Sequence, residues 1–388
     1  MVAPLTLHVA LLFEFPALNG GEHSMLTVLQ QFAVDSVIRF TAIAPTHGAL
    51  ADQLKQLNIP LVPFTVRSTA GVKRDIADLT VELQAIVATL QPNILHANSL
   101  SMSRLVAQCQ EQMAPVYCTG HIRDIMKIRT RTIGDLNRLS SIAVVSKTTK
   151  DFHEAQGLRS GLSKVIYNGV DTDRFCKRSR ANARNALLPQ LPKTAQVLLN
   201  VGQICLRKGQ LDLARAVVQL LQDRNDVYLV LVGERHSKKA ESVAYEQAIT
   251  DEFTASGRTN HLLRIGYSEN VEQWMNSADL LVHTARQEPL GRVLLEAAAS
   301  ELPTVATNVG GTPEILQHEQ SGFLVPPGDV SALVNCMHAA LAKPSQCQAY
   351  ATSAVERIKK IFTVRQACYA LKNFWQSANS PAPPEHHP

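Results

Sequence analysis

Two glutamates eight positions apart, Glu288 and Glu296, are placed to bind a ligand rich in hydroxyl groups. Glu296 lies in an apolar run, and burying an ionised carboxylate is costly unless a partner satisfies it. Leu290, Gly291 and Arg292 form the expected first turn of the helix between them, where backbone N–H groups are unpaired and the dipole favours an anion. The pattern favours a phosphate with nearby polyol hydroxyls. The alternative is that Glu296 reaches the surface or pairs with an arginine.

A basic pair, Arg207 and Lys208, stands near the end of the segment VGQICLRKGQLDL (201–213). We expect this segment to run from a strand through a loop into a helix. Cationic side chains at the carboxyl edge of a parallel sheet suit a pyrophosphate group. An exposed basic pair without a ligand is the alternative, but the glutamate helix in the same predicted domain favours the binding site.

Two features of the first half suggest a second group of site residues. Gly20 and Gly21 follow the first expected strand and open a helix, as in a loop that approaches a phosphate, although the segment matches neither the P-loop nor G-x-G-x-x-G. His121 ends the strand PVYCTGH, where a histidine can line a cleft. Its spacing alone is equally consistent with a core or surface histidine.

The elements that must position these residues alternate between strands and helices. Expected strands cover 5–13, 37–45, 93–99, 115–121 and 141–146, and the alternation restarts with 197–202, 227–233, 262–266, 279–285 and 303–308. Such alternation implies parallel sheets built from βαβ units. The polar, turn-rich segment 167–196 separates the two series. The sequence therefore predicts an α/β protein of two doubly wound domains, 1–170 and 171–362, followed by an amphipathic helix (363–378) and a disordered tail (379–388).

Composition excludes several classes of protein. Of the 388 residues, 45% are hydrophobic and 18% charged, which is enough apolar material for a sizeable core. No apolar run approaches the length of a spanning helix, and the apolar N-terminus is interpreted as a buried strand. The seven cysteines form no C-x-x-C pair, so we expect no zinc cluster or disulfide framework and a cytoplasmic location. We also expect no metal site, because no Asp-x-Asp pair stands in a cleft position.

Taken together, these pieces resemble the retaining glycosyltransferases of family 4, over roughly residues 5–378. The resemblance is carried by the E-x7-E pair Glu288 and Glu296, by Gly310, Gly311, Pro313 and Glu314 of a Gly-Gly-x-Pro-Glu segment, by Asn168–Asp171 (NGVD), by the NGGE glycine loop and by His121. It implies the GT-B architecture, two facing Rossmann-like domains, with the last helix crossing back to the first domain.

The resemblance also implies roles for these residues. A nucleotide-diphosphate sugar would be bound mainly by the second domain, with Glu296 on the ribose hydroxyls, Glu288 on the transferred sugar and Lys208 neutralising the diphosphate. Gln203 stands where the family often has arginine, so either Arg207 compensates or the diphosphate is stabilised less. Backbone near Tyr267 is the expected contact of the nucleobase.

The function that follows is metal-independent and cofactor-independent transfer of a hexose-type sugar from a UDP- or GDP-sugar to a hydroxyl acceptor, with retention. No residue would form a covalent intermediate, and His121 would orient the donor sugar or the acceptor. The acceptor could be a glycan, a lipid-linked molecule or a small molecule. The alternatives are a sugar-nucleotide epimerase on the same fold and a non-catalytic nucleotide-sugar-binding module.

The basic segment 121–138 suggests two further partners, a nucleic acid and a membrane surface. The net charge of +5 is too small to indicate a nucleic-acid binder, and no aromatic residue interleaves the basic ones here, so nucleic acid is not expected. Ile122, Ile125, Met126 and Ile128 could form one apolar helix face for peripheral contact with the inner face of a membrane. A solvated helix whose apolar face packs inward is the favoured alternative.

Overall fold

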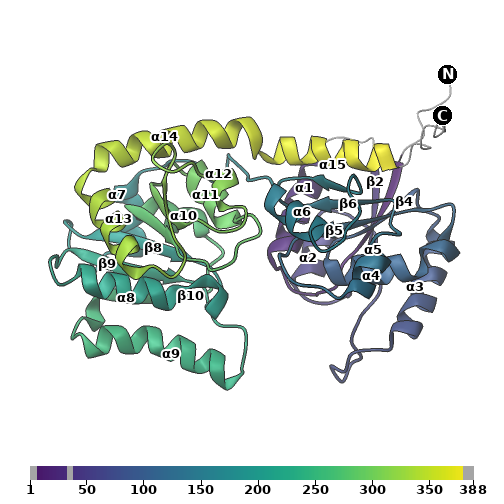
Figure 1. Cartoon of the computed structure of the whole chain (residues 1–388), viewed down its shortest axis with the longest axis horizontal. Helices are drawn as coiled ribbons and strands as arrows, with labels where there is room; N and C mark the ends of the chain where they lie inside the picture. Colours follow the sequence, from purple (N-terminus) through teal and green to yellow (C-terminus); the bar gives the residue numbers. More distant parts are fainter. Residues whose placement is uncertain (1–6, 33–37, 379–388) are drawn as a thin grey trace. The chain divides into compact units, whose positions relative to one another are not determined.

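The structure, a computed structural model, describes residues 7–32 and 38–378, so the predicted disordered tail 379–388 lies outside the described residues. The chain forms two compact units (Figure 1). The first takes in Met1–Gly169 and Val364–Pro388, and the second takes in Val170–Thr363.

The first unit is built on a seven-stranded parallel sheet of order β3-β2-β1-β4-β5-β6-β7. Its strands are β1 (Leu7–Leu12), β2 (Ile38–Ala44), β3 (Leu61–Pro63), β4 (Ile94–Ala97), β5 (Tyr117–Ile122), β6 (Ser141–Val144) and β7 (Ser163–Val165). Its helices are α1 (Gly20–Phe32), α2 (Ala49–Gln56), α3 (Ile76–Leu90), α4 (Leu100–Cys109), α5 (Thr130–Leu136), α6 (Lys147–Glu154) and α15 (Val364–Ala378).

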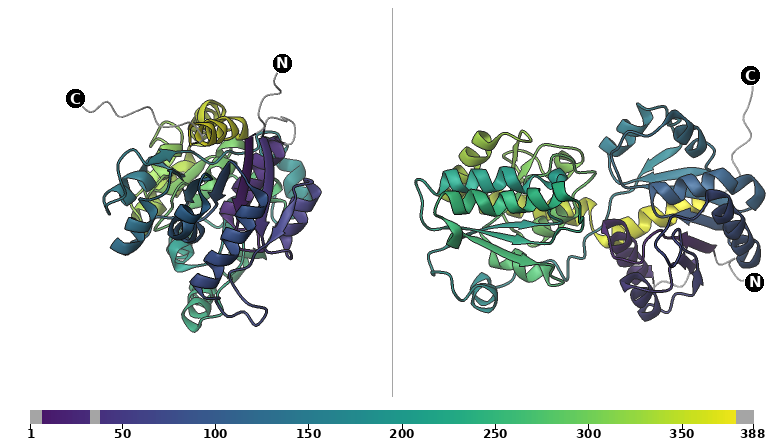
Figure 2. Two further views of the ribbon diagram at one scale, coloured as in Figure 1. Left: turned by 90° about the vertical axis from the view of Figure 1, so that its right-hand side faces the viewer. Right: turned by 90° about the horizontal axis from the view of Figure 1, so that it is seen from below.

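Both faces of this sheet are buried, which explains the continuous apolar strands of the sequence. Successive side chains of a strand point to opposite faces. Along β1, Val9 and Leu11 accordingly join one hydrophobic cluster, while Ala10 and Leu12 join another. Helices cover both faces (Figure 2).

The last helix, α15, packs on the first unit beside α1 (Figure 1). Trp375 is fully buried, and its ring lies 5.7 Å from that of Phe40 and 5.5 Å from that of His96. Of the apolar residues that predict an amphipathic helix here, Leu371, Phe374 and Trp375 face the core, whereas Tyr369 is 69% exposed.

The second unit contains a six-stranded parallel sheet of order β10-β9-β8-β11-β12-β13. Its strands are β8 (Gln196–Val201), β9 (Val227–Val232), β10 (Leu262–Gly266), β11 (Leu280–His283), β12 (Thr304–Thr307) and β13 (Phe323–Val325). Its helices are α7 (Arg180–Leu187), α8 (Gln210–Leu220), α9 (Ala240–Ala255), α10 (Val271–Ser277), α11 (Arg292–Ala299), α12 (Thr312–Ile315), α13 (Val330–Ala342) and α14 (Pro344–Ile361). The predicted α/β class with two doubly wound sheets is confirmed.

Each sheet has one switch point, a pair of neighbouring strands from which the chain continues toward opposite edges of the sheet. In the first unit this switch point lies between β1 and β4, and in the second it lies between β8 and β11. Loops that leave neighbouring strands in opposite directions open a crevice at their carboxyl ends, where ligands of doubly wound folds bind. Gly20 and Gly21 come after β1, Lys208 comes after β8 and Glu288 comes after β11, whereas His121 belongs to β5 and Tyr267 follows β10.

Candidate active site

The loop after β8 holds Lys208 against the loop after β11. Arg207 and Lys208 lie in a short 3-10 turn, Leu206–Lys208, which Gly209 ends with a left-handed φ of 67°. The carbonyl of Lys208 accepts from Thr284 Oγ1 at 3.1 Å, and the carbonyl of Arg207 accepts from Arg286 N at 2.8 Å. These bonds join the two loops and fix the start of the Lys208 side chain at the switch point.

The Lys208 ammonium forms an ion pair with Glu288, with Nζ 2.5 Å from Oε2. His283, the last residue of β11, places Nε2 3.0 Å from the same oxygen. Both glutamate and histidine are buried, at 7% and 2% exposed. Burial opposes ionisation of Glu288, but Lys208 and His283 outweigh it and hold the pKa of this carboxyl far below its usual range. Burial lowers the pKa of His283. Glu288 is therefore a carboxylate at neutral pH.

The start of α11 is shaped by glycines. Gly291 has a φ of 109°, and a Cβ there would lie 2.8 Å from Leu294 Cδ1. Gly311 donates its N–H to the carbonyl of Glu288 at 3.0 Å, and a Cβ on Gly311 would lie 2.5 Å from the carbonyl oxygen of Pro289. The Gly-Gly-x-Pro-Glu segment thus packs directly against the loop that carries Glu288. Leu290, the other predicted residue of this loop, is buried.

Glu296 lies on α11, one turn after Arg292, and its Oε1 is 3.0 Å from Arg292 Nε. The side chain is 5% exposed, and burial raises its pKa, with the charges of Arg292 and Arg174 opposing the rise. The arginine pairing considered for this carboxylate is therefore present, and it is intrahelical. Lys208 pairs with Glu288 rather than with Glu296.

The remaining predicted residues of this unit are more exposed. Arg207 is exposed and donates to the carbonyl of Gln287 at 3.2 Å. Gln203 is partly buried, and its carbonyl accepts from Gln210 Nε2 at 2.9 Å. Tyr267 follows β10 and is 60% exposed. These hydrogen bonds do not join Arg207 or Gln203 to the side chains of Lys208 or Glu288.

Sequence reasoning missed His283 and the ion pair between Arg286 and Asp212. His283 ends β11, but it lies inside the expected strand 279–285, so the strand-end signal that singled out His121 did not mark it. Arg286 reaches Asp212 through Nη2 and Nε at 2.8–3.0 Å. Asp212 is in the first turn of α8, and its pairing with a loop arginine depends on the fold rather than on any local pattern.

Two of the predicted residues of the first unit, Gly21 and His121, both contact Arg123. Arg123, just after β5, donates to Asn98 Oδ1 at 2.9 Å, to His121 Nδ1 at 3.1 Å and to Asn168 Oδ1 at 2.9 Å. Asn98 follows β4 and donates to the carbonyl of Gly21 at 3.3 Å. A Cβ on Gly21 would lie 2.9 Å from Arg123 Cδ, whereas one on Gly20 would meet nothing within 4 Å. Gly21 is therefore needed for close packing on Arg123.

The apolar helix face considered for 121–138 is not formed. Ile122 belongs to β5 and is fully buried, Ile125 is 8% exposed, and the helix of this segment, α5, begins only at Thr130. Ile128 packs on the core, so Met126, at 49% exposed, is alone among the four. The apolar side chains pack inward because the strand and its following loop need them for the core.

Neither a metal site nor a membrane-spanning helix is found in the described ranges, 7–32 and 38–378. No group of three histidine, cysteine or acidic side chains there is arranged to hold a metal ion. No helix in that part of the chain has the length and apolarity to cross a membrane.

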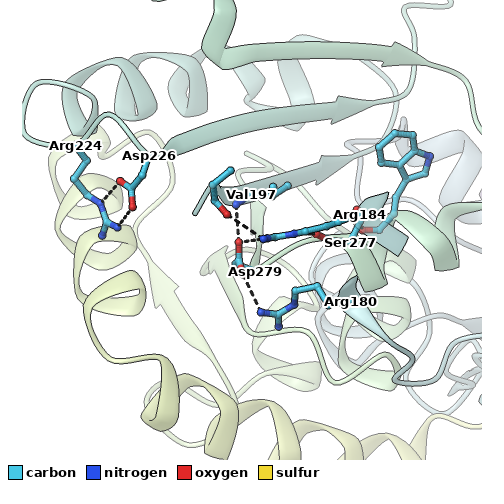
Figure 3. A network of polar contacts seen from close by, with 9 residues as sticks. Arg180, Arg184, Val197, Arg224, Asp226, Ser277 and Asp279 are labelled. Atoms are coloured by element: carbon cyan, nitrogen blue, oxygen red, sulfur yellow. Dashed lines mark hydrogen bonds and ion pairs between the residues drawn. The ribbon is translucent and has the colours of Figure 1, made fainter. Parts of the chain in front are cut away.

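A different polar network occupies the opposite, amino edge of the second sheet (Figure 3). Asp279, just before β11, accepts from Arg180 Nη1 at 2.8 Å, from the Arg184 guanidinium and from Val197 N at 2.7 Å. A cavity of about 430 Å³ opens nearby, lined in part by Arg224 and Asp226. These groups lie at the far end of the strands from Lys208 and Glu288, and they tie α7 to the sheet.

Two family models match this chain. The model described as Glycosyltransferase Family 4 matches residues 18–174, and the model described as Glycosyl transferases group 1 matches residues 187–357. Together they take in most of both units. The chain belongs to the GT-B glycosyltransferases of the family 4 type.

Individual relatives are more distant. A lipopolysaccharide core biosynthesis mannosyltransferase, LpsB of Rhizobium meliloti, is 26% identical over 55% of this chain and 60% of its own length. Sulfoquinovosyl transferase SQD2 of Arabidopsis thaliana is 24% identical over 75% of this chain and 58% of its own length. The chain thus spans about three fifths of the length of these curated relatives.

Solved structures share the fold over nearly the whole chain. The crystal structure of Anabaena HepE in complex with UDP and glucose has a TM-score of 0.83 at 23% identity, over 95% of this chain and 99% of that one. Sucrose-phosphate synthase from Thermosynechococcus elongatus has a TM-score of 0.81 at 17% identity, over 96% of this chain and 98% of that one.

Proposed function

We propose that this chain is a retaining glycosyltransferase that moves a hexose-type sugar from a UDP- or GDP-sugar to a hydroxyl acceptor, without a metal. The observation that carries the proposal is the buried ion pair of Lys208 and Glu288 at the switch point of the second unit. It brings a cation for a diphosphate and a carboxylate for hydroxyls to the place where doubly wound folds bind nucleotides. The UDP and UDP-glucose complexes of HepE favour a UDP-sugar.

Glycosyl transfer leaves negative charge on the departing diphosphate. A preorganised cation that stabilises this charge makes the largest contribution to catalysis. Lys208 is held by Glu288 through one of its three N–H groups, which leaves the others for phosphate oxygens. Arg207 and the N–H groups around Gly291 would add to this field. The pairing also orients the ammonium before the donor arrives, so little reorganisation is needed.

Glu288 would accept hydrogen bonds from the transferred sugar through Oε1, because Lys208 and His283 both engage Oε2. Glu296, which is buried in α11, would accept from the ribose hydroxyls. The proposed reaction is front-side attack, in which the leaving phosphate oxygen helps to deprotonate the acceptor, and no residue forms a covalent bond to the sugar.

The test begins with a thermal-shift screen of UDP, GDP, ADP and dTDP, followed by product analysis with the sugar nucleotide of the base that binds. Lys208→Ala should lower turnover by on the order of 10²–10³. Lys177→Ala is the control, because Lys177 also pairs with a glutamate, Glu301 at 2.9 Å, but in a more exposed pair beyond the other end of α11. Turnover of Lys208→Ala equal to that of Lys177→Ala would remove Lys208 from the mechanism.

Product analysis also separates the proposal from its competitors. An epimerised sugar nucleotide formed from the donor alone would indicate an epimerase, and binding without turnover over a broad acceptor panel would indicate a binding module. The configuration of the new glycosidic bond, read by NMR, tests retention.

The proposed location is the cytoplasm, which agrees with seven cysteines that are all free thiols. Contact of 121–138 with an anionic membrane is proposed only through exposed basic residues such as Lys127, Arg129 and Arg131, because Met126 alone does not make an apolar face. Co-sedimentation with phosphatidylserine vesicles at low and high salt tests this contact.

A further inference from the structure

The first unit contains a histidine whose two ring nitrogens have different surroundings. His121 is 1% exposed at the end of β5. Its Nδ1 lies 3.1 Å from Arg123 Nη2. Its Nε2 is buried and has no hydrogen-bond partner among the residues that the structure describes. A buried polar group of this kind is costly unless a ligand completes it.

We infer that Arg123 is a positioning residue that fixes His121 as the Nε2–H tautomer, so that His121 presents a hydrogen-bond donor to a substrate oxygen. The inference rests on the proposed function only for the identity of the substrate, a sugar hydroxyl or phosphate oxygen. It makes His121 a donor rather than a general base, because the one nitrogen that could take a proton already faces a cation.

The tautomer follows from the chemistry of arginine. A guanidinium has five N–H donors and no acceptor, so the contact with Nδ1 must run from Arg123 to the histidine. Nδ1 then carries no hydrogen, and the ring proton of a neutral His121 is on Nε2. Burial lowers the pKa of Arg123 only to about 10, so the guanidinium stays charged at neutral pH. Burial and the Arg123 charge lower the pKa of His121, which keeps the ring neutral.

The surroundings of Arg123 are built to hold this orientation. Asn98 and Asn168 accept from its two terminal nitrogens, each at 2.9 Å. Glu22, which is buried on α1, opposes the loss of its charge. Gly21 packs on its Cδ, as described above. The guanidinium is therefore held by residues that follow β4 and β7 and by the start of α1, and its fixed position orients the His121 ring.

The same chain supplies a matched control. Arg39 Nη2 lies 2.8 Å from His8 Nδ1, and His8 Nε2 lies 2.9 Å from Thr41 Oγ1. This second arginine–histidine contact is near the amino ends of β1 and β2, the opposite edge of the sheet from His121. A variant of this pair therefore tests the loss of an arginine–histidine contact away from the proposed binding site.

The experiment is NMR of the full-length chain labelled with ¹⁵N-histidine, with His121 assigned by comparison with His121→Gln. Long-range ¹H–¹⁵N correlations should show a neutral ring with its proton on Nε2 at pH 7. Arg123→Met, which removes the donor, should lose this preference, and Arg123→Lys, which can only donate, should keep it. Arg39→Met should leave the His121 signals unchanged.

The second measurement is enzymatic activity, followed as the release of UDP from UDP-glucose. Arg123→Met should lower kcat by about 10²-fold, the cost of misplacing a group at a reacting centre, with UDP affinity unchanged. Arg123→Lys should recover part of the loss, and Arg39→Met should match the wild type. Loss of kcat with no tautomer change would mean a structural role and overturn the inference.

A proton on Nδ1, or a charged His121 in the wild-type chain at pH 7, overturns the inference whatever the activity. That measurement needs no variant of Arg123, only His121→Gln for the assignment, so it decides the question even if Arg123→Met fails to fold. It also needs no substrate. Should the wild type release no UDP from UDP-glucose, the choice of donor fails while the tautomer result still stands or falls by itself.

Discussion

Gly209 lies so close to Thr284 that a Cβ on the glycine would be 2.0 Å from the threonine carbonyl oxygen. The contact joins the loop that carries Lys208 to the loop that leads to Glu288. Since carbonyl oxygen is backbone, it cannot move aside as a flexible side chain would. These two loops can therefore pack this closely only if residue 209 is glycine.

Gly209→Ala should accordingly separate the two loops and abolish most of the turnover. Gly257→Ala is the matched control, because Gly257 has nearly the same φ, 68° against 67°, but a Cβ there would meet nothing within 4 Å. The control should cost only the left-handed strain, about 1–2 kcal/mol of the free energy of unfolding. Urea denaturation and UDP-release assays of both variants measure the difference. Equal losses of stability would show that the contact with Thr284 is unimportant.

The pH profile tests the surroundings of Glu288. Lys208 and His283 hold its pKa far below the usual range, so its ionisation stabilises the fold above the pKa of the unfolded carboxyl and is lost only as the pH falls through the much lower folded value. The kcat of the wild type should therefore not fall near pH 5 through protonation of Glu288. In Lys208→Ala, burial dominates, and the carboxyl should protonate at a higher pH.

The measurement is kcat against pH for the wild type and for Lys208→Ala, with Lys177→Ala as the control. The residual activity of Lys208→Ala should fall at a higher pH than that of either other protein. A profile of the same shape in all three would mean that Lys208 does not control the ionisation of Glu288.

The network in Figure 3 predicts a contrast in stability. Asp279 is 13% exposed and joins Arg180, Arg184 and the backbone of Val197, whereas Asp226 is 37% exposed and joins Arg224 alone. Removing one partner of a buried pair leaves an uncompensated charge, while an exposed pair contributes little. Asp279→Ala should lower the free energy of unfolding by about 3 kcal/mol, and Asp226→Ala by at most about 1 kcal/mol.

Chemical denaturation followed by circular dichroism gives both values. Per-molecule turnover of the folded protein should stay unchanged in both variants, because the network lies at the amino edge of the sheet. A loss for Asp279→Ala no larger than that for Asp226→Ala would show that α7 is held to the sheet by other contacts.

The elements that position the site could be predicted where one face of a segment is buried. In 20–32, Met25, Val28, Leu29 and Phe32 recur at helical spacing and indicate a helix, and α1 has these bounds, with all four residues buried. In contrast, α7 lies inside a segment interpreted as a polar connection, since none of its residues is buried. Its helix depends on the Ser179 cap and on the long-range pairing of Arg184 with Asp279, neither of which leaves an apolar pattern.

The candidate site was predictable to a similar extent. Residue type and strand ends indicated Lys208, Glu288 and His121, and the structure brings Lys208 to Glu288. Which carboxylate the lysine would meet was not predictable, because both follow β11 and the choice depends on the course of the loop between β11 and α11. The link from Arg123 to His121 was also missed, since spacing of two along an extended segment gives no direction for a guanidinium.

Glu296 provides the last prediction, which concerns the pH dependence of nucleotide binding. Burial raises the pKa of this carboxyl, with Arg292 and Arg174 opposing. As the pH falls, the group should protonate earlier than an exposed glutamate, whose pKa is about 4.3, and its ability to accept two ribose hydroxyls should weaken.

The Kd of UDP, measured by calorimetry, should rise on acidification in the wild type. In Glu296→Gln it should be higher at neutral pH and nearly independent of pH, because the amide does not titrate. The binding of pyrophosphate alone, which has no ribose, should respond equally in both proteins, and a wild-type Kd for UDP with the same pH dependence as Glu296→Gln would remove Glu296 from the nucleotide site.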